Sequence, residues 1–145
     1  MNRQDVRREA QQMLGSVPGF FDSMPEPHVG PMWEHFRDMQ LRPGQIPPKY
    51  QQLMMLAVST YAKCKYCTDF HTEVAKALGA TKEEIAEVAL LTGLTADFSN
   101  YLGGTQYDME QFKREVRAAC QYLSTNGNGA RASAAAQGGA QPPRR

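Results

Sequence analysis

Residues 48–78 read PKYQQLMMLAVSTYAKCKYCTDFHTEVAKAL, with apolar side chains at helical spacing after Pro48, a residue that suits a first helical turn. One face carries apolar or small residues at i, i+3, i+4, i+7, i+8 and i+11: Leu53, Leu56, Ala57, Thr60, Tyr61 and Cys64. Met54, Met55 and Val58 make the other sides of this helix apolar as well. Because a helix that is apolar all round is buried on every side, the pattern predicts a partner subunit for so small a chain.

The segments that follow are predicted to be helical too. A helix over 66–78 ends at Gly79, since glycine suits the left-handed position after a helix. Thr81 and Glu84 form a predicted capping box for the next helix, whose apolar stripe runs toward Leu94 and which breaks at Gly103-Gly104. A last helix is expected over 109–123, capped by Asp108, with Cys120 as a small buried hydrophobe on its apolar stripe.

Three helices are expected before Pro48, over 4–14, 20–24 and 31–41. The first ends at Gly15, and the third has Pro31 in its first turn and presents Met32, Phe36 and Met39 on one side. Since no run of alternating β-branched residues predicts a strand, the chain is predicted to be all-α.

The sequence predicts one helical domain over 1–123 and a low-complexity tail over 124–145. The tail holds six Ala, four Gly and two Pro and no large apolar side chain. It cannot bury enough surface to offset its ordering entropy, so we expect it to be disordered.

Charge and hydropathy exclude several classes of function. Lys and Arg total 16 against 15 Asp and Glu, so bulk charge favours neither nucleic acid nor an anionic membrane as a partner. The charged opening residues do not form a signal peptide, and the longest apolar run, Leu53 to Val58, is too short to span a bilayer. With three cysteines, an odd number, the chain is not a secreted disulfide scaffold, and we expect it in the cytoplasm.

The motif Cys64-Lys-Tyr-Cys67-Thr-Asp-Phe-His71 is the candidate for chemistry. If Cys67 lies in the first turn of a helix, unpaired N–H groups and the helix dipole favour its thiolate. His71 follows one turn later on the same face and can accept the thiol proton. A sulfenic acid formed on Cys67 by a peroxide could then condense with Cys64, which predicts Cys67 as the nucleophile and Cys64 as the resolving cysteine.

Two other interpretations of the motif remain open. Cys64, Cys67 and His71 could bind structural zinc if Cys120, His28 or His35 supplied a fourth ligand. The cysteines could also be inert core residues. Covalent haem attachment is disfavoured, because position 68 is threonine rather than histidine.

The stretch from Pro48 to Val88 resembles the carboxymuconolactone decarboxylase and alkylhydroperoxidase AhpD-like family. The resemblance is carried by Leu53-Met-Met-Leu-Ala-Val58, the two cysteines, His71 to Ala80, and Thr81 to Glu87. Gly15-Ser-Val-Pro-Gly-Phe-Phe21 and the segment around Trp33 are similar to the N-terminal part of peroxidase-related members.

This resemblance implies an AhpD-like helical bundle whose subunits form homo-trimers or homo-hexamers. It also implies a thiol-dependent peroxidase or disulfide oxidoreductase that reduces alkyl hydroperoxides without haem, flavin or metal. Such a reaction needs a thiol reductant, for example a thioredoxin-like or lipoyl protein. Cys64, Cys67 and His71 carry over as site residues. Beside them, Gln52 and Tyr66 are possible orienting or relay groups.

At one position the sequence departs from the family motif. A glutamate stands twelve residues before the first cysteine in the motif and joins a proton relay, whereas this chain has Gln52 there. Glutamine can donate and accept hydrogen bonds but cannot take a proton at neutral pH. In a straight helix residues 52 and 64 would lie about 18 Å apart, so any contact of Gln52 with the thiol site needs a chain reversal or another subunit.

Two alternatives to the peroxidase stay open. Decarboxylases of the same superfamily work without the cysteine pair, so a lyase acting on a small carboxylated lactone would survive replacement of both cysteines. A non-enzymatic oligomeric module with structural zinc would instead lose its fold with its metal.

Overall fold

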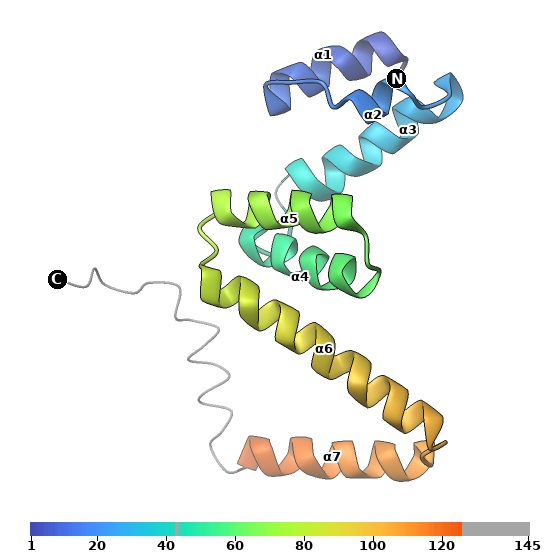
Figure 1. Cartoon of the computed structure of the whole chain (residues 1–145), viewed down its shortest axis with the longest axis vertical. Coiled ribbons are helices and arrows are strands. Elements are labelled where there is room, and N and C mark those ends of the chain that lie inside the picture. Colours follow the sequence, from blue (N-terminus) through green and yellow to red (C-terminus); the bar gives the residue numbers. More distant parts are fainter. Residues whose placement is uncertain (43, 126–145) are drawn as a thin grey trace, which may run out of the picture. The chain divides into compact units, whose positions relative to one another are not determined.

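The computed structural model describes residues 1–42 and 44–125, which are helical apart from short connections and contain no strand (Figure 1). The fold class predicted from the sequence, all-α, is confirmed. In order, the elements are α1 (Arg3–Leu14), α2 (Gly19–Asp22), α3 (Glu26–Phe36), the π-helical turn η1 (Arg37–Leu41), α4 (Pro48–Tyr61), α5 (Lys65–Ala77), α6 (Lys82–Gly104) and α7 (Met109–Thr125).

The chain forms two compact units, the first over Met1–Ala96 and the second beginning at Asp97. All residues expected at the thiol site lie in the first unit. In the second, α7 extends two residues past Leu123, so Ser124 and Thr125 are helical rather than part of a tail. The remainder of the predicted tail, 126–145, lies outside the described residues. No helix in the described ranges is long and apolar enough to cross a membrane.

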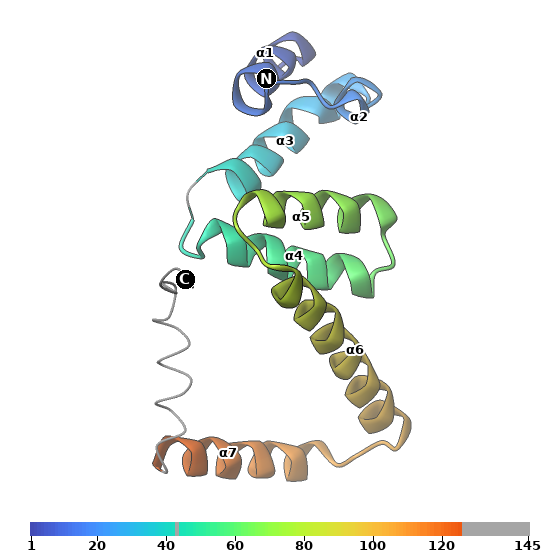
Figure 2. The ribbon, with the colours of Figure 1, turned by 60° about the vertical axis from the view of Figure 1, so that its left-hand side comes forward.

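Helices α4 and α5 form an antiparallel hairpin and lie side by side in both views (Figures 1 and 2). The chain reverses at Lys63, whose φ of 55° is left-handed and costs a non-glycine residue about 1–2 kcal/mol. The N–H of Cys64 then donates to the carbonyl of Ser59, 3.0 Å away. The sequence predicts Cys64 at the end of the helix before this turn, but the reversal makes it the N-cap residue of α5.

The face of α4 that meets α5 buries Leu53 and Leu56 together with two polar residues, Gln52 and Ser59. Its outer side is exposed in the single chain, with Val58 62% accessible. The sequence predicted burial on every side, which the chain alone does not provide. A partner subunit that covers this outer side therefore stays a prediction.

Helices α1, α2 and α3 pack around their own apolar cluster of Val6, Ala10, Phe21, Val29 and Trp33. Arg3 stabilises this layer, because its side chain pairs with Glu26 and donates hydrogen bonds to the carbonyls of Phe21, Asp22 and Met24. Gly15 ends α1 at φ 70°, as predicted.

The predicted start of α3 at Pro31 is wrong. The helix begins at Glu26 because Pro27 fits the first turn, where an N–H would have no partner in any case, and Pro31 lies inside the helix. Trp33 is fully buried against Phe21, with ring centroids 5.4 Å apart, whereas Met32 and Met39 are exposed. The aromatic packing, rather than the methionines, sets which face of α3 points inward.

The end of this segment is a π-helical turn, η1. The N–H of Arg42 donates to the carbonyl of Arg37 at 3.2 Å, which is an i to i+5 bond. The guanidinium of Arg37 pairs with Glu9 of α1 at 3.2 Å and with Asp38 at 2.8 Å. Trp33 Nε1 donates to the same Glu9 carboxylate at 2.6 Å, and this bond is the largest contribution to lowering the pKa of Glu9. Helix α1 thus holds the start of η1.

We expect Trp33→Ala to lower the free energy of unfolding by about 3–5 kcal/mol, because it leaves a cavity under three helices. The neighbouring Met32→Ala is the matched control and should change it by less than about 0.5 kcal/mol, since Met32 is 49% exposed. Urea denaturation followed by circular dichroism measures both. Equal losses for the two variants would contradict the inward face assigned to α3.

Candidate active site at the start of helix α5

The two cysteines of the motif meet at the N-terminus of α5. Cys64 is the N-cap residue and Cys67 lies in the first turn, as predicted. Both are free thiols, and their Sγ atoms lie 2.9 Å apart. The backbone N–H of Cys67 donates to the sulfur of Cys64 at 3.4 Å. The pair is therefore close enough to exchange a proton or to form a disulfide.

The sequence predicts that the thiolate is favoured at Cys67, but the structure lowers the pKa of Cys64 instead. The hydrogen bond between the sulfurs lowers the pKa of Cys64 and raises the pKa of Cys67. The backbone N–H of Cys67 adds to the stabilisation of the Cys64 thiolate. The physical reason is the capping position, because the N-cap sulfur, not the one inside the first turn, faces an unpaired N–H group.

His71 and Gln52 form a buried hydrogen bond across the α4–α5 hairpin, with His71 Nδ1 2.7 Å from Gln52 Oε1. Nε2 of the same Gln52 amide donates to Oε1 of Gln40 on η1 at 2.9 Å. In this arrangement Nδ1 of His71 carries the proton and Nε2 keeps its lone pair. The chain reversal at Lys63 thus supplies the contact with Gln52 that a straight helix would forbid.

Burial keeps His71 neutral near pH 7. The residue is 5% exposed, and desolvation lowers the pKa of its imidazole. Gln52 carries no charge that would offset this loss of hydration. In the described part of the chain, Nε2 of His71 makes no hydrogen bond, so it is available to accept a proton.

A cavity of about 610 Å³ joins Cys67 to His71. Its walls are mainly apolar and come from both helical layers: Leu14, Pro18 and Phe20 near the N-terminus, then Phe36, Met55 and Phe70. Gln40 adds a polar edge, and Tyr66 lies at the rim. Phe36 and Phe70 are neighbours, with ring centroids 6.1 Å apart. The described lining holds no Lys, Arg, Asp or Glu side chain.

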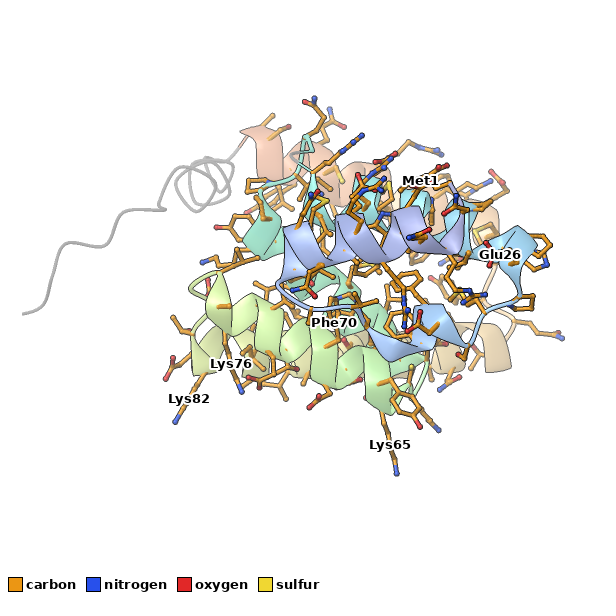
Figure 3. All side chains as sticks on the ribbon, turned by 90° about the horizontal axis from the view of Figure 1, so that it is seen from above. Met1, Glu26, Lys65, Phe70, Lys76 and Lys82 are labelled. Carbon is orange, nitrogen blue, oxygen red and sulfur yellow. The ribbon has the colours of Figure 1, made fainter. Side chains whose placement is uncertain are left out.

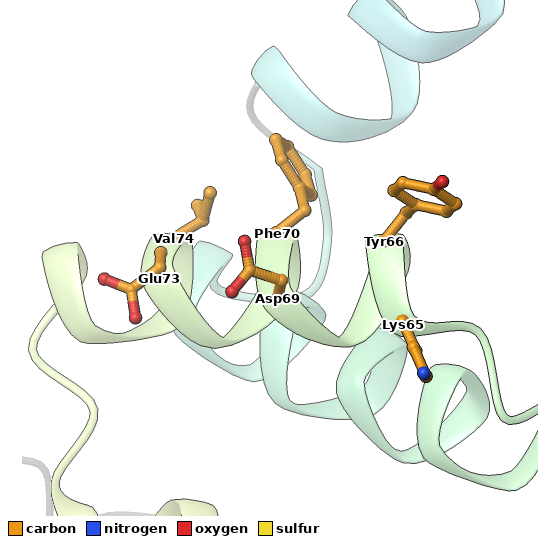
Figure 4. A pocket seen from close by; sticks show the side chains of 6 residues that line it. All are labelled: Lys65, Tyr66, Asp69, Phe70, Glu73 and Val74. Carbon is orange, nitrogen blue, oxygen red and sulfur yellow. The ribbon is translucent and has the colours of Figure 1, made fainter.

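Tyr66 meets the thiols through its backbone rather than its hydroxyl, because a hydrogen bond from its N–H helps to lower the pKa of Cys64. It is 89% exposed, and its hydroxyl makes no hydrogen bond among the described residues. On the outer surface of α5, Tyr66, Phe70 and Val74 follow one another along the helix beside the charged groups of Asp69 and Glu73 (Figure 4). Seen from above the N-terminal helices, Lys65 projects away from the molecule (Figure 3).

The fourth zinc ligands considered from the sequence are not brought together with the motif. Within residues 1–42 and 44–125, no group of three or more His, Cys, Asp or Glu side chains is placed to hold a metal ion. His28 and His35 are exposed. Cys120 is exposed in the chain as well, so the prediction that it is buried is wrong; the apolar face of α7 is not covered within the described residues.

Sequence reasoning missed Gln40 and the apolar walls supplied by the N-terminal helices. The segment 37–41 had been assigned to an ordinary helix end, and no residue pattern distinguishes a π turn from an α turn there. Gly15-Ser-Val-Pro-Gly-Phe-Phe21 had been singled out, but nothing local indicates that Pro18 and Phe20 face the thiols.

The chain is similar to known proteins over the part that contains the cysteine motif. The model of the carboxymuconolactone decarboxylase family matches residues 27–104, more than half of the 145 residues. The chain belongs to this family. The match includes α3 from Pro27 on, η1, α4, α5 and α6, and therefore Cys64, Cys67 and His71, but not the cavity walls supplied by residues 14–20. No curated protein matches the sequence.

Two solved structures are similar to the chain. The alkylhydroperoxidase AhpD core from Rhodospirillum rubrum has a TM-score of 0.68 at 27% identity, covering 76% of this chain and 85% of that one. A protein from Methanobacterium thermoautotrophicum has a TM-score of 0.51 at 26% identity, covering 60% of this chain and 96% of that one. The AhpD-like helical fold inferred from the resemblance is confirmed.

The burial of His71 makes stability depend on pH. Because its pKa is lower in the folded than in the unfolded chain, unfolding takes up a proton at low pH, so the stabilisation is complete above the unfolded pKa of about 6.5 and is lost as pH falls. We expect the urea concentration at the midpoint of unfolding to decrease as the pH is lowered from 7.5 to 5, a range above that in which carboxylates titrate. His71→Asn should reduce this dependence of the midpoint on pH. His35→Asn, at an exposed position, should leave it unchanged.

Proposed function

We propose that the chain is a thiol-dependent peroxidase that reduces alkyl hydroperoxides through Cys64, Cys67 and His71. The observation that carries the proposal is the arrangement of these groups. Cys67 and His71 line one cavity, and the second sulfur lies 2.9 Å from the first. The similarity to the AhpD core supports the same activity.

In the proposed first step, Nε2 of His71 takes the proton of Cys67. The thiolate attacks the distal oxygen of the hydroperoxide, the O–O bond breaks, and the imidazolium returns the proton to the leaving alkoxide. The products are a sulfenic acid on Cys67 and an alcohol. Cys64 then condenses with the sulfenic acid, releasing water and forming a disulfide. An external dithiol, such as a thioredoxin-like or lipoyl protein, must reduce this disulfide.

Cys67 is the proposed nucleophile because it, and not Cys64, faces the cavity. In the resting pair the pKa of Cys64 is lowered and the pKa of Cys67 is raised, so Cys67 holds its proton more firmly than Cys64 does. Reaction therefore depends on a base that can remove this proton when substrate is bound. Neutral His71, with Nε2 free, supplies such a base.

The cavity favours an organic hydroperoxide over the alternative lyase substrate. Its walls are apolar, and burying an alkyl or aryl group there gains about 25 cal/mol for each Å² removed from water. A carboxylated lactone would bring a charge into a cavity whose described lining has no Lys or Arg to pair with it. The charge requirement disfavours the decarboxylase reaction at this site.

We expect the reduced protein to turn over cumene hydroperoxide with a dithiol reductant, and Cys67→Ser to abolish this turnover. Cys64→Ser should allow one oxidation per subunit and then stop, because no disulfide can form. Cys120→Ser is the matched control and should retain full activity. Peroxide consumption and peptide mapping measure these outcomes. Two thiols that remain free after full exposure of the wild-type protein to peroxide would rule out the proposal.

We also propose that the subunits form a homo-trimer or homo-hexamer. The protein would work in the cytoplasm, where thiols are kept reduced. Support for an oligomer comes from the outer side of α4, where Met54, Val58 and Tyr61 are exposed in the single chain. A helix face of this composition is unfavourable in water.

Light scattering after size exclusion should therefore give three or six times the chain mass of 16.2 kDa. Val58→Glu should dissociate the assembly, since it places a charge in the proposed interface. Met32→Glu, at a similarly exposed position on α3, is the control and should leave the mass unchanged. A wild-type monomer at micromolar concentration would contradict this part of the proposal.

A further inference from the structure

The hydrogen-bonded amide of Gln52 has two orientations that fill the same space. With Oε1 toward His71, as described, Nδ1 of the imidazole carries the proton and Nε2 is the base. With Nε2 of Gln52 toward His71, Nδ1 would accept instead, and Nε2 of His71 would carry the proton. Only the first orientation leaves a lone pair on Nε2 of His71, a residue that lines the cavity.

The partner of Gln52 on its other side is coupled to these orientations, because its oxygen pairs with the first and a donor there would pair with the second. Gln52 is 2% exposed, so its amide group must be paired on both sides or lose about 1–3 kcal/mol. Gln40 is that second partner, since its Oε1 accepts the N–H of Gln52 at 2.9 Å. An acceptor at residue 40 directs the oxygen of Gln52 toward His71, and a donor there would direct the nitrogen.

The backbone that carries Gln40 is held in place from elsewhere. Gln40 lies on η1, whose widened turn changes the direction of the side chains after Arg37 relative to an α-helix. Arg37 is anchored by Glu9 of α1 and by Asp38. The position of Gln40 is therefore fixed by the N-terminal helices.

We propose that Gln40 is a positioning residue, which accepts a hydrogen bond from Gln52 and thereby keeps the proton of His71 on Nδ1. Its role in catalysis rests on the proposed peroxidase function, but the proton position itself does not. Gln40 touches neither sulfur; it acts through Gln52.

Two substitutions of similar reach test this directly. Ionised Gln40→Glu can only accept, and we expect it to preserve the Nδ1–H form of His71. Gln40→Lys can only donate, so it should move the proton to Nε2. It should also slow alkylation of Cys67 at neutral pH by about tenfold, since a general base contributes about 10²–10⁴-fold.

Long-range ¹H–¹⁵N spectra of the reduced, ¹⁵N-labelled protein read the proton position without any peroxide. Gln51→Glu and Gln51→Lys are the charge-matched controls, because Gln51 is next to Gln52 but its side chain makes no hydrogen bond among the described residues. Both should keep the Nδ1–H form and report the effect of charge alone on alkylation.

The inference is overturned if wild-type His71 carries its proton on Nε2. It is also overturned if Gln40→Lys keeps the wild-type proton position, or alters alkylation only as much as Gln51→Lys does. If the proton positions follow the prediction while the wild-type protein reduces no hydroperoxide, the role of Gln40 stands and the proposed function fails.

Discussion

Gln52 and His71 meet inside the α4–α5 hairpin, where Oε1 and Nδ1 are 2.7 Å apart and both side chains are buried. An amide and an imidazole can be removed from water together only if each satisfies the other. In the described residues no buried side-chain nitrogen or oxygen is left unpaired. The hairpin therefore has to close in the register that pairs these two groups, and this register also places Cys67 beside the cavity.

Helices α1 to α3 also help to build the thiol site, because they hold η1, which carries Gln40. Glu9 accepts hydrogen bonds from both Trp33 and Arg37, and so ties the buried end of α3 to the start of η1. A π turn is a less favourable backbone than an α-helix and persists only where its surroundings stabilise it. These contacts explain why helices that contain no thiol still contribute to the thiol site, through Gln40 and through the walls of the cavity.

The parts of the structure that depend on local sequence could be predicted. Helical periodicity, Gly15, Gly79 and the Thr81–Glu84 capping box indicate most of the helices, with the segment 26–41 as the exception, and the box forms with both its hydrogen bonds. The position of Cys67 in a first turn also follows from residues near it. What could not be predicted depends on tertiary contacts: the left-handed Lys63, the π turn before Arg42, and the contact between residues 52 and 71.

The amide at position 52 changes how the proton must move. A carboxylate 2.7 Å from Nδ1 would raise the pKa of His71 and could itself hold a proton, so that base and relay would share the work. Glutamine does neither, and desolvation then lowers the pKa of the imidazole. In the proposed reaction His71 is then a neutral base with one available nitrogen, and the orientation of Gln52 controls whether that nitrogen carries a lone pair or a proton. In such a site the hydrogen-bond direction takes over the role that charge has in the family motif.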